Sequence, residues 1–214
     1  MKGLFRNNFF TVWANAKVFS VFMLLFGVFI VAVRSQSFQI GYALTGIIGF
    51  SVNAASVVKS EFVTKWGKYK LTLPVKRADI IKSYFINQLV WMLAGALFVG
   101  IETGLSWLWH GCPFDQPVDA LSMIALGISI SLFMGAMFFP AFYLGGAERS
   151  DVFLIISLLC AFGIDLAIVT ITNELLEPGI SAVLTGAAVL LICSLLAFCI
   201  SYPLTVYIFK KKEY

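Results

Sequence analysis

Six long apolar runs constrain this chain more than any other feature. They occupy residues 18–33, 40–58, 84–105, 120–144, 152–172 and 181–209. Most are close to the roughly 20 helical residues that cross a hydrocarbon core of about 30 Å. Charged residues make up 12% of the 214 residues, and a chain this short cannot bury so much apolar surface in one aqueous core. We therefore predict a single-domain, all-α membrane protein, residues 1–214, with six transmembrane helices.

The basic residues predict the orientation of these spans. With the N-terminus inside, fourteen of the fifteen Lys and Arg residues fall on inner segments, and only Arg34 falls outside. This strong positive-inside bias predicts that both termini are cytoplasmic, and it places Trp107 and Trp109 at the outer interface. Because the charges sit at the ends of apolar runs, the net charge of +4 does not indicate nucleic-acid binding.

Residues 1–17, ahead of the first span, carry an amphipathic pattern. The apolar stripe consists of Phe5, Phe9, Val12, Trp13 and Ala16, and the polar face carries Arg6, Asn7, Asn8 and Asn15. Helical spacing of the stripe predicts a short interfacial helix in the inner headgroup plane. The alternative is a disordered polar lead.

The only long inner loop, residues 59–82, holds a second aromatic stripe. Phe62, Trp66, Tyr69 and Leu73 follow one another at spacings of four, three and four residues, and Pro74 ends or turns that helix. Such a stripe on a basic helix either lies on anionic lipid or docks into a groove of a cytoplasmic partner. Periodicity alone does not decide between the two.

Two segments resemble one known family. Trp66, Tyr69, Leu73, Pro74 and Arg77 match a signature that ABC-2-type permease subunits of ATP-binding-cassette exporters carry between their second and third spans. Residues 139–149, which include Glu148 and Arg149, are similar to that family's aromatic, proline and glycine element between spans four and five. Within the family, the chain resembles permeases of phenol-soluble modulin exporters. It departs at Lys76, where a small hydroxyl residue often caps the next helix.

The resemblance implies a permease of the bacterial plasma membrane that works with other chains. The sequence has no phosphate-binding loop, so ATP and Mg²⁺ are expected on a separate ATPase subunit, with no cofactor and no enzyme activity on this chain. A second permease chain, identical or related, would complete a twofold conduit. The residues expected to contact the ATPase are Phe62, Trp66, Tyr69, Leu73, Pro74, Arg77, Glu148 and Arg149.

The substrate path is predicted from intramembrane polar residues. We take Asp165 as the one carboxylate clearly inside a predicted span, where an acid is costly and faces protein or water. Asn53 and Thr170 are weaker candidates, and the alternative for Asp165 is an acid near outer water or paired within the bundle. Apolar spans and mildly acidic outer loops favour export of amphipathic or antimicrobial-type peptides. A non-transporting immunity or sensor subunit and a secondary transporter remain alternatives. No metal site is predicted.

Overall fold

The computed structural model describes residues 2–33, 35–64, 76–111, 114, 116–177 and 179–211. Within them, six helices are long and apolar enough to cross a membrane, which confirms the predicted six-span, all-α fold. These helices are α1 (Lys2–Val33), α2 (Gln36–Val63), α4 (Arg77–His110), α5 (Pro117–Gly145), α6 (Ser150–Leu175) and α7 (Ile180–Lys211), with a 3-10 helix, η1 (Ala147–Arg149), before α6.

The helices are longer than the apolar runs that predicted them. They contain 26 to 34 residues, or about 39 to 51 Å at 1.5 Å per residue, against a hydrocarbon core of about 30 Å. α4 begins at Arg77 rather than residue 84 and ends at His110 rather than residue 105. Backbone hydrogen bonding continues past the point where charged residues lower the mean hydropathy, so apolar runs underestimate helix length.

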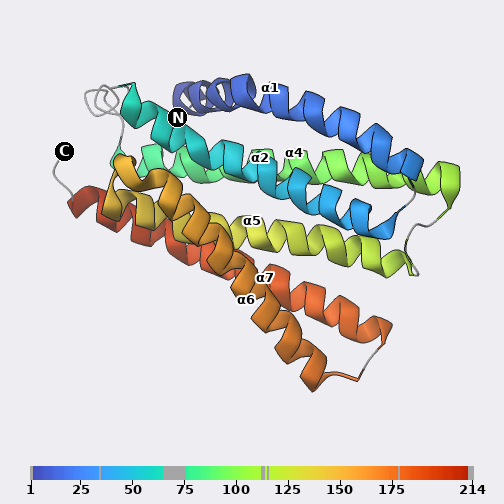
Figure 1. Cartoon of the computed structure of the whole chain (residues 1–214). Coiled ribbons are helices and arrows are strands. Elements are labelled where there is room, and N and C mark those ends of the chain that lie inside the picture. The colour runs from blue at the N-terminus through green and yellow to red at the C-terminus, as the bar shows by residue number, and fades with distance from the viewer. Residues whose placement is uncertain are drawn as a thin grey trace.

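The helices run up and down the bundle. The first turns of α1, the end of α2, the start of α4, η1 and the end of α7 lie at one end (Figure 1). We call this the inner end, following the orientation that the basic residues predict. The opposite, outer end holds the connections from α1 to α2, from α4 to α5 and from α6 to α7.

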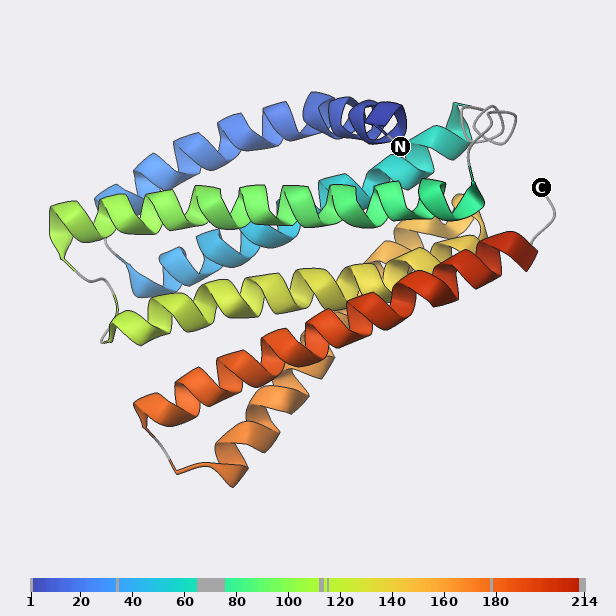
Figure 2. The same cartoon turned by 180° about the vertical axis from the view of Figure 1, so that it is seen from behind.

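α1 joins two segments that the sequence predicted separately. It is one uninterrupted helix, but its first turns are seen nearly end-on in Figures 1 and 2 while the rest is seen from the side, so the helix bends. Val12 and Ala16, from the predicted apolar stripe, are buried inside the bundle. Phe9 stacks on Trp91 of α4 with ring centroids 5.1 Å apart. Part of the stripe therefore packs on protein.

α5 forms the core of the bundle, whereas α6 and α7 are mostly exposed. In the most apolar stretch of each helix, 67% of the residues of α5 are buried, against 17% for α6 and for α7. α7 packs along α5, and both α6 and α7 diverge from the other helices toward the outer end (Figures 1 and 2). The exposed apolar faces of α6 and α7 are therefore available to lipid or to another membrane chain.

One hydrogen bond fixes α7 to α5 at a proline. Pro140 has no N–H to donate to the carbonyl of Ala136, four residues earlier in the same helix. The buried Ser201 hydroxyl of α7 donates to that carbonyl instead, at 2.6 Å. A neighbouring helix thus satisfies the backbone group that the proline frees, as the bilayer interior requires.

Candidate functional site

Most of the predicted coupling stripe lies outside the described part of the chain. Trp66, Tyr69, Leu73 and Pro74 belong to residues 65–75, and Phe62 is placed only as a helical residue of α2. The predicted ATPase contacts that the structure does describe are Arg77, Glu148 and Arg149. All three are exposed at the inner end, where an ATPase on the cytoplasmic side could reach them.

An ion pair joins the end of α2 to the start of α6, next to Glu148 and Arg149. Lys59, near the end of α2, forms an ion pair with Asp151, in the first turn of α6, with Nζ and Oδ2 2.6 Å apart. Asp151 lies two residues after Arg149 of η1, and Lys59 lies four residues before the end of α2 at Val63. The ion pair thus joins the inner ends of α2 and α6, which are almost a hundred residues apart in the sequence. Because the pair is largely solvent-exposed, it marks proximity more than it adds stability.

Residues of both family motifs contact the end of α7. Its guanidinium carbon lies 5.9 Å from the centre of the Phe209 ring, and its Nη1 donates to the carbonyl oxygen of Lys210 at 3.3 Å. The other side of the contact is Tyr143, whose ring centroid is 5.0 Å from that of Phe209. Arg77 and Tyr143 belong to different motifs, so both motifs meet on Phe209. No sequence pattern predicts a role for Phe209, because it lies in an ordinary apolar run.

A buried group of polar side chains lies at the inner end, and the sequence analysis missed it. We call Asn7, Asn8, Glu61, Ser83 and Tyr84 the inner polar cluster. The Tyr84 hydroxyl donates to Glu61, Asn7 Nδ2 approaches the same carboxylate at 3.5 Å, and Asn8 Nδ2 donates to Ser83 Oγ at 3.0 Å. Glu61 is only 3% exposed, and Asn8, assigned above to a solvated polar face, is fully buried. The cluster ties the start of α1 to both helices that flank the coupling loop.

The predicted substrate-path residues do not come together. Among the described residues, no hydrogen bond joins any two of Asn53, Asp165 and Thr170. Asn53 donates to the carbonyl of Gly49 in its own helix at 2.9 Å, and the exposed Thr170 hydroxyl likewise bonds the backbone of its own helix. Such local bonds leave neither side chain dedicated to a ligand.

Asp165 is paired inside the bundle. It is 2% exposed, and its Oδ1 accepts a hydrogen bond from Ser129 Oγ of α5 at 2.6 Å, while Oδ2 has no partner among the described residues. This geometry matches the alternative of an acid paired within the bundle. Its role in a substrate path stays a prediction.

The statement that Asp165 is the one clearly intramembrane carboxylate is wrong. Glu102 also lies inside a span, eight residues before the end of α4 at His110, and it is buried. The predicted end of this span at residue 105 placed Glu102 within one helical turn of outer water. α4 continues about two helical turns past Glu102 to His110, so Glu102 lies within the helix and not at its end.

Comparison with known proteins assigns the chain to a family. The model of a family described as ABC-2 family transporter protein matches residues 3–210, which is nearly the whole chain. No curated protein and no solved structure shows significant similarity to it. The match covers the six spans and the two motif segments that meet at the inner end. This chain is a member of the ABC-2 transporter family, and as such a membrane-spanning permease component of an ABC transporter.

Proposed function

We propose that this chain is one of two permease subunits in a bacterial exporter that a separate ATPase drives, and that it moves amphipathic peptides out of the cell. The observation that carries the proposal is the Lys59–Asp151 ion pair. It joins the end of α2, which precedes the predicted coupling segment, to the start of α6, next to Glu148 and Arg149. A single ATPase groove could therefore engage both contacts at once.

The contacts at the inner end suggest how the ATPase would move the permease. Arg77 begins α4, and through Phe209 it is packed against the ends of α7 and α5. The inner polar cluster connects the same region to α1 and α2. A push on the coupling loop would thus reach several helices together, because packed helices move as rigid elements. ATP and Mg²⁺ would act on the partner subunit.

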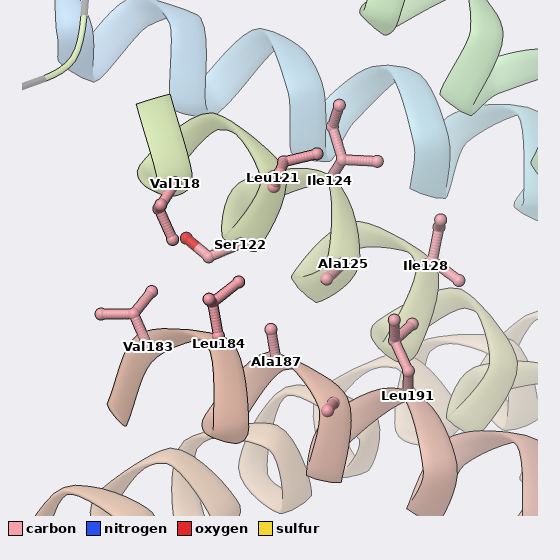
Figure 3. A pocket seen from close by; sticks show the side chains of 11 residues that line it. Val118, Leu121, Ser122, Ile124, Ala125, Ile128, Val183, Leu184, Ala187 and Leu191 are labelled. Carbon is pink, nitrogen blue, oxygen red and sulfur yellow. The ribbon is translucent and has the colours of Figure 1, made fainter. Parts of the chain in front are cut away.

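The outer half of the bundle suits an apolar or amphipathic substrate. Where α7 diverges from α5, apolar side chains of both helices face each other across a cavity of about 370 Å³ (Figure 3). Its one hydroxyl, that of Ser122, donates to the backbone of Asp119 and is not free for a ligand. The exposed apolar faces of α6 and α7 offer a surface for a second permease chain, with which a conduit could be closed.

Co-purification tests the coupling surface. With the ATPase subunit co-expressed, Trp66→Ala combined with Tyr69→Ala should abolish its retention on the affinity-tagged permease and abolish peptide export. The matched control is Trp107→Ala combined with Leu108→Ala, which removes exposed apolar side chains at the outer end and should leave retention intact. Unchanged ATPase retention and export in the Trp66/Tyr69 variant would refute the proposed coupling.

The peptide substrate needs a separate measurement. Amphipathic cationic peptides should raise ATP hydrolysis by the reconstituted complex, while anionic peptides of equal length should not. Retention of the ATPase without any peptide stimulation or export would instead support a non-transporting immunity or sensor subunit.

A further inference from the structure

Glu102 is a buried acid to which the described residues offer no hydrogen-bond partner. Its side chain is 7% exposed, and both carboxylate oxygens are buried without a hydrogen-bond partner among the described residues. The hydroxyl of Thr103, the next residue, lies close enough to act on the charge but outside hydrogen-bond geometry. Glu102 lies about 12 Å along the helix axis from His110 and about 7.5 Å from Trp107, which is predicted at the outer interface. In that orientation Glu102 lies below the level of the lipid headgroups.

An unpaired carboxylate at this depth costs free energy. Intramembrane acids are rare for this reason, and they usually face a protein partner, water or a ligand. The bundle elsewhere meets this requirement with donors from neighbouring helices, as at Glu61 and Asp165. The described residues of α1, α2 and α4 offer Glu102 no hydrogen-bond donor. The Glu102 side chain lines a cavity, and its two oxygens lie beneath the cavity surface.

The cavity has the size and composition of a small-molecule site. It lies between α1, α2 and α4 with a volume of about 440 Å³, within the range of about 300–1,000 Å³ that ligand pockets occupy. Among the described residues, Glu102 is its one charged lining residue, with Phe98 one turn below and Leu105 and Trp109 above. The carboxylate thus has apolar and aromatic surface on both sides along the helix.

Two further contacts shape this site. Gly27 brings α1 close, since a Cβ built there would lie 2.8 Å from Tyr42 Oη and 3.5 Å from Glu102 Cγ. The Tyr42 hydroxyl donates to the carbonyl of Met23 at 3.2 Å. The Tyr42 side chain also lines the cavity. Tyr42, Phe98 and Trp109 are therefore available for cation–π contacts around the acid.

We propose that this cavity binds a lipophilic organic cation, a molecule whose positive charge is surrounded by apolar groups. The Glu102 side chain would turn so that its buried carboxylate pairs with the charge, and the apolar groups would contact the aromatic and aliphatic side chains on either side. A metal ion does not fit, because hard cations require six or more oxygen ligands and Glu102 supplies two at most. A phospholipid headgroup does not fit either, because the described part of the lining offers no cationic residue for its phosphate. The site rests on this geometry alone, independently of the proposed peptide export.

Binding of tetraphenylphosphonium to the full-length chain in lipid nanodiscs tests the proposal. Equilibrium dialysis, corrected with empty nanodiscs, should show saturable binding that Glu102→Gln weakens about tenfold or more, because the buried charge pair is lost. Tetraphenylborate has the same shape and the opposite charge, and Glu102→Gln should leave its binding unchanged or improve it. Glu174→Gln, which removes an exposed acid at the outer end of α6, should change neither.

A second variant tests the cavity without touching the acid. Val28 lines the cavity and is 73% exposed on α1, so Val28→Trp should fill the space without disturbing the core and should abolish tetraphenylphosphonium binding. Leu25→Trp is the matched control, since Leu25 is 70% exposed on the same helix but does not line the cavity. Absence of saturable binding to the wild-type chain, equal binding by wild type and Glu102→Gln, or equal losses in the two tryptophan variants would each overturn the proposal.

Discussion

The two ends of the bundle bury carboxylates in opposite conditions. At the inner end, Glu61 accepts a hydrogen bond from Tyr84 and is approached by Asn7. In the outer half, Glu102 is buried to a similar extent, but neither of its oxygens has a hydrogen-bond partner among the described residues. Both acids lie on long apolar helices, so composition does not distinguish them. The difference lies in what the neighbouring helices place opposite each one.

This difference divides the molecule into a fixed inner end and a more open outer half. Partnered polar groups, the ring contacts around Phe209 and the Ser201 bond hold the inner helices together. The outer half contains both cavities described above, of about 370 and 440 Å³. Such a division suits a transporter, because a rigid inner end can transmit force from an ATPase. An outer half with cavities can admit a ligand.

The largest expected effect is at the partnered acid. Glu61→Leu should lower the free energy of unfolding by about 3 kcal/mol, because Tyr84 would be left as a buried donor, and Asn7 as a half-buried one, without this acceptor. Reversible unfolding by sodium dodecyl sulfate, in mixed micelles, measures this loss. Tyr84→Phe removes one donor and keeps the ring, so it should cost less than Glu61→Leu. A Glu61→Leu variant as stable as the wild type would show that the inner end is not held by this cluster.

The same substitution at the unpartnered acid should have the opposite sign. Glu102→Leu should raise the free energy of unfolding by about 1–2 kcal/mol, since it replaces a buried polar group without a hydrogen-bond partner by an apolar one of similar size. The measurement is the same titration, with the two leucine variants side by side. Destabilisation by Glu102→Leu would mean that the carboxylate has a partner in the folded chain, and the contrast between the two ends would fail.

The number, order and helical character of the spans could be predicted from the sequence. Membrane-crossing helices require long apolar runs, and these runs are visible without any tertiary information. The two motif segments were also found from the sequence, because they are local. The ends of the helices were not. Predicted ends at residues 58 and 105 left Glu61 in a loop and Glu102 near water, whereas α2 and α4 continue to Val63 and His110.

The contacts that organise the candidate sites could not be predicted, because they join distant segments. Arg77 meets Phe209, and Lys59 meets Asp151, only after the helices have packed. Asn8 looked like a surface residue because its sequence neighbours are polar, but its face of the helix is decided by the bend and packing of α1. Single-sequence periodicity shows which residues share a face, and not what that face meets.

Asp165 is the intermediate case and should show the smallest effect. One of its oxygens accepts from Ser129 and the other has no partner among the described residues. Asp165→Asn keeps an acceptor for Ser129 while it removes a buried charge, so the weaker hydrogen bond and the relief of desolvation should offset each other to within about 1 kcal/mol. Ser129→Ala should lower the free energy of unfolding by more, because it leaves the charge without its donor.

The export measurement decides the role of Asp165. If Asp165→Asn stops export while its unfolding is unchanged, Asp165 acts in the substrate path. If both are unchanged, its contact with Ser129 is a structural link between α5 and α6, and Glu102 remains the intramembrane acid that the fold leaves open to a ligand.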